Sequence, residues 1–307
     1  MKVFLNEPIH KDAYQLLNDN FDIIDDLSYI QDADIIITRN LQLDKNILNK
    51  CHSLKLIAVH GSGYDDVDVE YAKSHHIHLM NTPGENALSV AELNVALMLE
   101  LSRKIYSLNK DKKDGLIKEV APIQYMGNEI SYKTAGFIGY GHIAKKTIEI
   151  LKYGFHMNTL VYSPDLTYEQ ASRDGIQYTE DIKDIFRSSD FIFICCSLNE
   201  ETYHMINKEH FDLMKPTSYL INTSRGAIIN EDSLYDALIN KTFAGAGLDV
   251  IENEPVDNHH PIITLNNVIY TSHMGASTDD ALKRVGLCMV EGIINYVKND
   301  NSKYLVF

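Results

Sequence analysis

The fold is decided by Thr134-Ala135-Gly136-Phe137-Ile138-Gly139-Tyr140-Gly141-His142-Ile143-Ala144. An apolar run ends there in a turn with the spacing Gly-x-Gly-x-x-Ala, and apolar residues at helical spacing follow it. Gly139 permits the tight turn, Gly141 lets the backbone approach a pyrophosphate, and the small Ala144 lets the helix pack on the strand. His142 and Ile143 open a helix whose N-terminus would face the phosphates. The stretch therefore predicts a dinucleotide-binding βα unit; a purely structural turn is the alternative.

Apolar runs recur on both sides of this unit, with helical stretches between them. Before it, strands are predicted at residues 2–5, 34–38, 55–59 and 78–80, helices at 11–17, 44–50, 69–75 and 89–106, and a loop at 111–115. From it onward, strands are predicted at 134–138, 158–162, 191–195, 218–222, 245–250 and 267–271, and a last helix at 278–298. Alternating strands and helices indicate parallel sheets. We therefore expect an α/β chain with two doubly wound parallel-sheet domains.

The length, charge and cysteine content of the chain limit the kinds of partner and compartment that it suits. The chain has 307 residues, which is enough for two domains, and its net charge of −15 argues against nucleic acid or an anionic membrane as a main partner. No apolar run approaches the roughly 18 residues of a membrane span. The N-terminus lacks a signal-peptide pattern, and the four cysteines fit neither a zinc site nor a disulfide framework. We therefore expect a cytoplasmic protein without a metal site.

Three segments in the last third each supply one polar side chain at or just after a predicted strand end. Arg225 can hold a carboxylate with two parallel hydrogen bonds, His273 can move a proton near neutral pH, and Glu254 can orient the imidazole ring. Taken singly, each residue has a plainer interpretation: a surface arginine, a solvated acidic loop, or a structural histidine. His259 and His260 are rival histidines, but they lie in a polar loop. The conjunction predicts hydride exchange between a nicotinamide and a 2-hydroxy acid.

The cofactor choice rests on the strand that follows the glycine turn. Its end should carry an acidic residue for the adenosine ribose hydroxyls. The chain has Ser163 there, and Asp165 comes two residues later. No arginine follows immediately to hold a 2′-phosphate, so the sequence favours NAD and leaves NADP open.

The ordered motifs closely resemble the D-isomer-specific 2-hydroxyacid dehydrogenase family over essentially the whole chain. The resemblance lies in the glycine turn, in residues 81–92 (NTPGENALSVAE) and in three later motifs: 222–226 (NTSRG), 248–255 (LDVIENEP) and 273–278 (HMGAST). It implies a flavodoxin-like substrate domain, residues 1–100 plus 285–307, and an inserted Rossmann domain, residues 101–284. It also implies a homodimer, with the helix after Ser89 at the interface.

The resemblance further implies roles for individual residues. Arg225 would bind and polarise the 2-oxo acid, and His273 would exchange the proton with Glu254 as its partner. Asp249 would lie near the nicotinamide carboxamide, and the backbone around Ser62 and Gly63 would take the substrate carboxylate. Two positions depart from the family pattern: Ser163 replaces the usual aspartate, and Ser272 stands where proline is common.

Among subgroups, the motifs look most like those of phosphoglycerate dehydrogenases. That subgroup holds its substrate phosphate with arginines; Arg39 matches one such position, while His60 stands where a second arginine is common. Glyoxylate, hydroxypyruvate and other small 2-oxo acids are the alternative substrates. A non-enzymatic NAD(H)-sensing protein, similar to the C-terminal binding protein co-repressors, is a further alternative because such relatives keep the same site residues.

Overall fold

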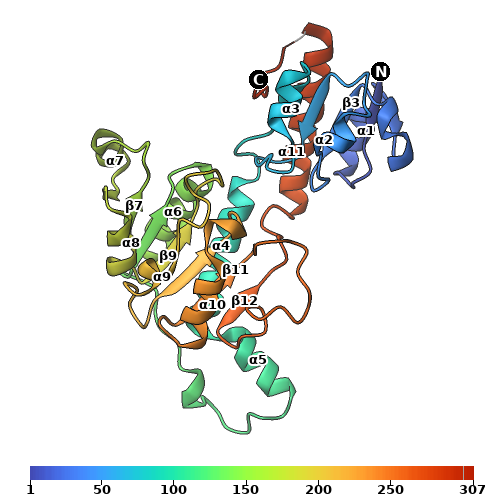
Figure 1. The fold of residues 1–307 in the computed structure, drawn as a ribbon. Helices are drawn as coiled ribbons and strands as arrows, with labels where there is room; N and C mark the ends of the chain where they lie inside the picture. Colours follow the sequence, from blue (N-terminus) through green and yellow to red (C-terminus); the bar gives the residue numbers. More distant parts are fainter. Residues whose placement is uncertain (300) are drawn as a thin grey trace. The chain divides into compact units, whose positions relative to one another are not determined.

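A computed structural model describes residues 1–299 and 301–307 of the chain and divides it into two compact units (Figure 1). Unit 1 comprises Met1–Ser89 and Ala276–Phe307, and unit 2 comprises Val90–Gly275. The unit boundaries fall somewhat earlier in the chain than the predicted residues 100 and 284. No helix in the described ranges is long and apolar enough to cross a membrane.

Unit 1 is built on a five-stranded parallel sheet of order β2-β1-β3-β4-β5, which is the flavodoxin-like order. Its strands are β1 (Lys2–Phe4), β2 (Asp22–Ile24), β3 (Ile35–Thr38), β4 (Leu56–Val59) and β5 (His78–Met80). Its helices are α1 (Lys11–Asn18), η1 (Leu27–Asp32, 3₁₀), α2 (Lys45–Leu48), α3 (Val69–Ser74) and α11 (Asp279–Asn299). The apolar face of α11 packs with α1 against the sheet, and this contact brings the C-terminal segment into unit 1.

Unit 2 carries a seven-stranded parallel sheet of order β12-β11-β10-β9-β6-β7-β8, the Rossmann order with one further strand. The strands are β6 (Thr134–Ile138), β7 (Asn158–Tyr162), β8 (Gln177–Tyr178), β9 (Phe191–Ile194), β10 (Tyr219–Asn222), β11 (Gly245–Leu248) and β12 (Val268–Tyr270). The helices are α5 (Ile105–Lys113), η2 (Ile123–Tyr125), α6 (His142–Phe155), α7 (Tyr168–Asp174), α8 (Ile182–Ser188), α9 (Lys208–Phe211), η3 (Gly226–Ile228) and α10 (Glu231–Ile239). Helix α4 (Ala87–Arg103) begins in unit 1 and runs into unit 2.

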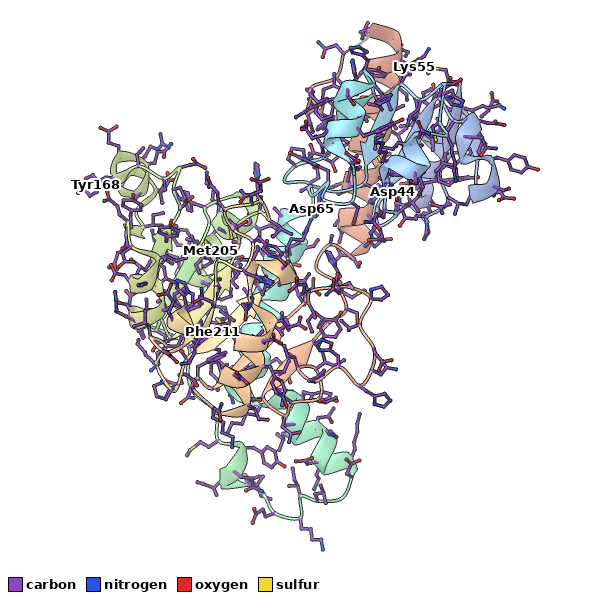
Figure 2. The ribbon with its side chains drawn as sticks, in the orientation of Figure 1. Asp44, Lys55, Asp65, Tyr168, Met205 and Phe211 are labelled. Carbon is purple, nitrogen blue, oxygen red and sulfur yellow. The ribbon has the colours of Figure 1, made fainter. Side chains whose placement is uncertain are left out.

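The central strands of both sheets are buried along their whole length and mainly apolar, as is typical of parallel strands with helices on both faces of the sheet. Phe211, the last residue of α9, is fully buried, whereas Tyr168 at the start of α7 projects outward and is 77% exposed (Figure 2). The two doubly wound parallel-sheet domains predicted from the sequence are confirmed.

Two local predictions are wrong. The sequence predicts a loop at residues 111–115, but α5 continues to Lys113. The long helix predicted over residues 89–106 is interrupted at Lys104, whose φ of 52° is left-handed. Glu100 accepts a hydrogen bond from the backbone N–H of Tyr106, the second residue of α5, so its side chain caps the second helix.

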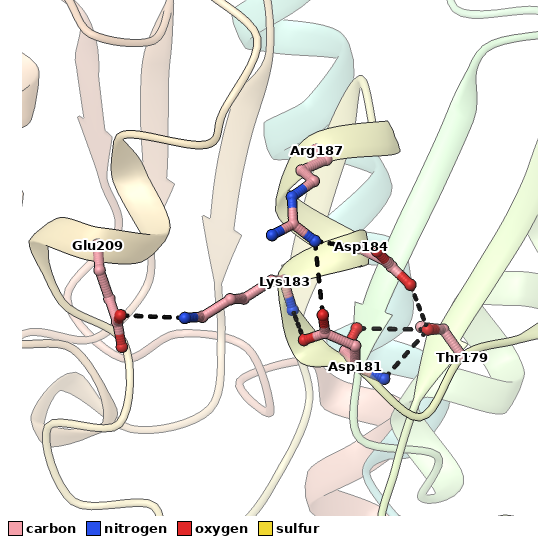
Figure 3. Close-up of polar contacts among 6 residues, drawn as sticks. All are labelled: Thr179, Asp181, Lys183, Asp184, Arg187 and Glu209. Carbon is pink, nitrogen blue, oxygen red and sulfur yellow. Dashed lines mark hydrogen bonds and ion pairs between the residues drawn. The ribbon is translucent and has the colours of Figure 1, made fainter.

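Polar contacts fix the start of α8 (Figure 3). The carboxylate of Asp181 accepts from the backbone N–H of Lys183 at 2.9 Å, as expected of an N-cap. Arg187 pairs with Asp184 at 3.1 Å, and Lys183 pairs with Glu209 of α9 at 3.1 Å. These are exposed ion pairs, which contribute little to stability.

Candidate active site

The glycine turn lies between β6 and α6, at the point in the sheet where the strand order reverses. Gly139 has a φ of 99°, and a Cβ there would come within 2.7 Å of the Cys195 backbone. Gly141 is the N-cap of α6; no side chain of the described residues caps that end, and a Cβ on Gly141 would meet open space. Uncapped helix N–H groups beside an open glycine suit a pyrophosphate, so the turn fits a dinucleotide.

The end of β7 carries the residue expected near the adenosine ribose. The carbonyl of Ser163 accepts from the Leu166 N–H at 3.1 Å, which closes a turn after the strand. Ser163 is therefore placed at the strand end, as predicted.

Arg225 lies in a loop between β10 and η3 that the preceding asparagine organises. Asn222 is fully buried; its Oδ1 accepts from the Ser224 N–H at 3.0 Å and its Nδ2 donates to the Arg225 carbonyl at 2.9 Å. The guanidinium of Arg225 donates to the Ser224 carbonyl at 2.8 Å. These three hydrogen bonds fix the backbone of Ser224 and Arg225.

His273 and Glu254 are brought together although nineteen residues separate them. The Nδ1 atom of His273 lies 2.7 Å from Oε2 of Glu254, and Oε1 of Glu254 accepts from the Ile251 N–H at 3.1 Å. The two side chains are 47% and 26% exposed. A carboxylate on Nδ1 fixes the ring orientation and leaves Nε2 to exchange a proton.

Asp249 holds the turn that carries the histidine. Ser272 and His273 both adopt left-handed backbone conformations, with φ of 46° and 56°, which is unusual for residues with a Cβ. The carboxylate of Asp249 is only 1% exposed and accepts from the N–H groups of Met274 (2.7 Å) and Gly275 (2.8 Å). Its backbone carbonyl also accepts from the His273 N–H.

The predicted substrate residues Arg39, His60, Ser62 and Gly63 all belong to unit 1. Arg39 follows β3; its guanidinium donates to Ser277 Oγ at 2.8 Å, and its backbone N–H donates to the Glu7 carboxylate at 2.7 Å. The carbonyl of Ser62 accepts from the Asn81 side chain at 2.7 Å, so the loop is tied to the segment after β5. Gly63 stays exposed on that loop.

His60 is only 6% exposed and lies against Gly286 of α11. Its Nε2 finds no hydrogen-bond partner within residues 1–299 and 301–307. Burial and the nearby charge of Arg39 lower its pKa to about 4. His60 is therefore neutral at pH 7.

Similarity to known proteins identifies the family of this chain. Residues 95–275 match the family described as D-isomer specific 2-hydroxyacid dehydrogenase, NAD binding domain. The chain belongs to the D-isomer specific 2-hydroxyacid dehydrogenase family. The predicted family, its oxidoreductase class and its dinucleotide cofactor are confirmed.

Individual relatives of this dehydrogenase carry different names. A D-3-phosphoglycerate dehydrogenase from Methanocaldococcus jannaschii is 33% identical across 100% of the chain, which spans only 59% of that relative's length. A hydroxypyruvate reductase from Thermotoga maritima is 34% identical and covers 95% of this chain and 97% of its own. A crystal structure of D-lactate dehydrogenase from Aquifex aeolicus with NAD and lactic acid gives a TM-score of 0.86 at 27% identity, covering 98% and 96% of the two chains. The names span several 2-hydroxy acids and select no single substrate.

The sequence does not predict two residues that support this candidate site. Asn94 of α4 is 1% exposed; its Oδ1 accepts from Thr223 Oγ1 at 2.9 Å, beside the Arg225 loop. Glu231 begins α10 and contacts the turn that carries Glu254. Both lie outside the motifs of the site residues. A polar residue inside the otherwise apolar stripe of α4 is the signal that marks Asn94.

Proposed function

We propose that this chain reduces small, unphosphorylated 2-oxo acids to D-2-hydroxy acids, with His273 as the proton donor, Glu254 as its orienting partner and Arg225 as the substrate anchor. The observation that carries the proposal is the 2.7 Å contact between His273 Nδ1 and Glu254 Oε2. Because Glu254 occupies Nδ1, the proton for the developing alkoxide comes from Nε2. The ionised Glu254 also stabilises the imidazolium before transfer.

When bound, a nicotinamide dinucleotide would supply the hydride for this reduction. The glycine turn would hold its pyrophosphate through the N–H groups of α6, next to Gly141. Asp249 keeps the histidine turn in its left-handed conformation and so sets where the imidazole stands. Ser163 offers the ribose a hydroxyl without a charge, so it repels a 2′-phosphate less than an aspartate would. The proposed preference for NADH over NADPH is therefore modest.

The charges around Arg39 favour an unphosphorylated substrate. A phosphoryl group carries close to two negative charges at pH 7 and needs fixed positive partners. The Glu7 carboxylate accepts from the backbone N–H of Arg39 and of Asn40, which places a negative charge beside the arginine. His60 is buried and neutral, so it adds no positive charge. A monocarboxylate needs no second cation in this region.

Phosphoglycerate dehydrogenase is the second candidate. It is favoured by the retained Arg39 and by the 33% identity with the Methanocaldococcus enzyme of that name. In this case Arg39 would bind the phosphoryl group, and each charge-assisted hydrogen bond would contribute about 1.5–3 kcal/mol.

Steady-state turnover with a panel of 2-oxo acids, run with NADH and with NADPH, tests the proposal. We expect glyoxylate or hydroxypyruvate to give a higher kcat/KM than phosphohydroxypyruvate, and NADH to exceed NADPH several-fold. Arg39→Ala should then affect hydroxypyruvate and phosphohydroxypyruvate alike. If Arg39→Ala damages only the phosphorylated acid and His60→Arg improves it, the second candidate holds. Absence of turnover on every acid, with NADH still bound, would favour an NAD(H)-sensing protein.

A homodimer in the reducing cytoplasm completes the proposal. An apolar arm, residues 105–126, follows α4 and extends away from the sheet of unit 2 (Figure 1). Its side chains Ile105, Tyr106, Leu116, Val120, Ile123 and Met126 are 51–97% exposed. Apolar side chains gathered on one projecting segment are typical of a surface covered by a partner. All four cysteines are free thiols, which suits a reducing compartment.

A further inference from the structure

The turn that presents Glu254 to His273 is held from outside the reacting pair. The backbone N–H of Glu252 donates to Oε2 of Glu231 at 3.2 Å, while the neighbouring N–H of Ile251 donates to Glu254 itself at 3.1 Å. Two consecutive N–H groups are thus bound by two carboxylates. One belongs to the proposed acid–base pair, and the other belongs to the first turn of α10.

Glu231 is itself fixed on its other oxygen. Its Oε1 lies 2.9 Å from Nε2 of His260, and both side chains are largely buried, at 28% and 20% exposure. The Nε2 atom of His260, a rival candidate for the acid–base group, is therefore hydrogen-bonded to Glu231. The side chain of Glu252 is held separately by His204 at 2.8 Å.

The backbones of the same two segments touch. A Cβ built on Gly226, the residue after Arg225, would lie 2.0 Å from the backbone carbon of Ile251. Any side chain there would push the Glu254 turn away from the Arg225 loop. Since Arg225, Gly226 and Glu231 belong to one continuous segment, that segment contacts the Glu254 turn at two points.

We propose that Glu231 is a positioning residue for the reaction: with Gly226 it clamps the Glu254 turn against the Arg225 segment, and so sets the geometry of the proposed acid, its partner and the substrate anchor. The inference rests on the proposed function, in that Glu254 acts through His273. Glu231 binds the backbone N–H of Glu252, two residues before Glu254, so its effect on Glu254 passes through the backbone of the turn. Misplacement of a reacting group by about 1 Å can cost roughly 10²-fold in rate.

A double-mutant cycle tests the clamp. Glu231→Ala should lower kcat roughly tenfold for the best 2-oxo acid and leave the Kd of NADH unchanged. Glu231→Gln keeps one acceptor oxygen and should lose less. In a Glu254→Gln background the Glu231→Ala change should cost less than about twofold, because its effect is already lost. Equal losses in both backgrounds would show that Glu231 does not act through Glu254 and would overturn the proposal.

A second readout does not depend on turnover. Amide hydrogen exchange of the peptide containing Ile251 and Glu252 should accelerate in Glu231→Ala, while peptides from unit 1 keep the wild-type rate. The matched control is Glu209→Gln, which removes the charge of another carboxylate in the first turn of a helix, one that pairs with the exposed Lys183 (Figure 3). This control should keep wild-type kcat and exchange. If the wild type reduces no 2-oxo acid, the proposed function fails while the exchange still tests the clamp; unchanged exchange in Glu231→Ala overturns the clamp itself.

Discussion

At the scale of single residues, the proposed acid–base histidine has an unfavourable backbone conformation that its surroundings must stabilise. Left-handed φ values at Ser272 and His273 cost on the order of 1 kcal/mol each. The buried Asp249 offsets that cost because both its carboxylate oxygens and its backbone carbonyl accept hydrogen bonds from N–H groups of the turn. The position of the imidazole therefore depends on a residue that need not touch the substrate.

His273→Ala removes the proposed proton donor. Turnover should fall by roughly 10²–10⁴-fold, the usual contribution of a general acid, while the Kd of NADH stays within about twofold of wild type. Stopped-flow reduction and fluorescence titration of NADH measure the two quantities. His259→Ala is the control, since His259 is exposed in the neighbouring loop. Near-wild-type turnover in His273→Ala, with a loss in His259→Ala, would move the role to the other histidine.

His60 should make unit 1 less stable in acid. Its pKa is lowered to about 4 in the folded chain, from an ordinary value near 6.5, because burial and Arg39 disfavour the charged ring. Protonation of His60 therefore favours the unfolded chain. The contribution of the neutral ring to the stability of the fold is complete above about pH 6.5 and is lost as the pH falls towards 4. Between pH 7.5 and pH 5 the free energy of unfolding should drop by about 2 kcal/mol from this group alone.

His60→Gln isolates that contribution from the other titrating groups. Urea unfolding at pH 7.5 and at pH 5 should show a smaller drop for the variant than for the wild type. An identical pH dependence in both proteins would mean that folding does not change the pKa of the ring, and at pH 5 Arg39 would then have a second cation beside it.

At the scale of elements, the two glycines of the turn between β6 and α6, Gly139 and Gly141, should respond differently to substitution by alanine. Gly139→Ala meets the Cys195 backbone at 2.7 Å and a φ of 99°, so unit 2 should lose at least about 1–3 kcal/mol of stability. Gly141→Ala has open space and an ordinary φ of −81°, so the stability should change by less than about 1 kcal/mol. NADH affinity should nevertheless fall roughly tenfold, because the methyl group occupies the approach to the helix N-terminus. Thermal unfolding and NADH titration separate the two effects, and equal melting temperatures for the two variants would contradict this account.

The sequence predicts most elements because central parallel strands contain unbroken apolar runs, such as residues 35–37 and 191–194. It does not predict β2 or β8, since these short edge strands, three and two residues long, are partly exposed and lack that signal. The lysines at the end of α5 resemble a polar loop, yet they stabilise a helix C-terminus.

The candidate site, too, is only partly predictable from the sequence. Arg225, Glu254 and His273 can be selected from the sequence because each follows a strand and has a chemically suitable side chain. The contacts of Glu231 and Asn94 cannot be selected in this way, because they depend on how segments far apart in the chain meet. The neutrality of His60 likewise arises from burial under α11, which no local pattern reveals.

At the scale of the whole molecule, the apolar arm of residues 105–126 leads us to expect a dimer in solution. Val120 is 97% exposed and Ile123 is 76% exposed, which is costly for a monomer in water. The double variant Val120→Asp, Ile123→Glu adds two charges to the arm without touching either sheet. If a second copy covers the arm, burying those unpaired charges should weaken association by more than about 3 kcal/mol, at least a hundredfold in Kd.

Sedimentation velocity over a range of protein concentrations measures this change. The wild type should sediment as a dimer and the double variant as a monomer at the same micromolar concentration. Tyr168→Asp provides the control, because Tyr168 is also an exposed apolar side chain, 77% exposed, but stands on α7 outside the arm. It should remain dimeric. A monomeric wild type would contradict the proposed dimer, and a dimer that survives both charges on the arm would place the contact between copies elsewhere on the chain.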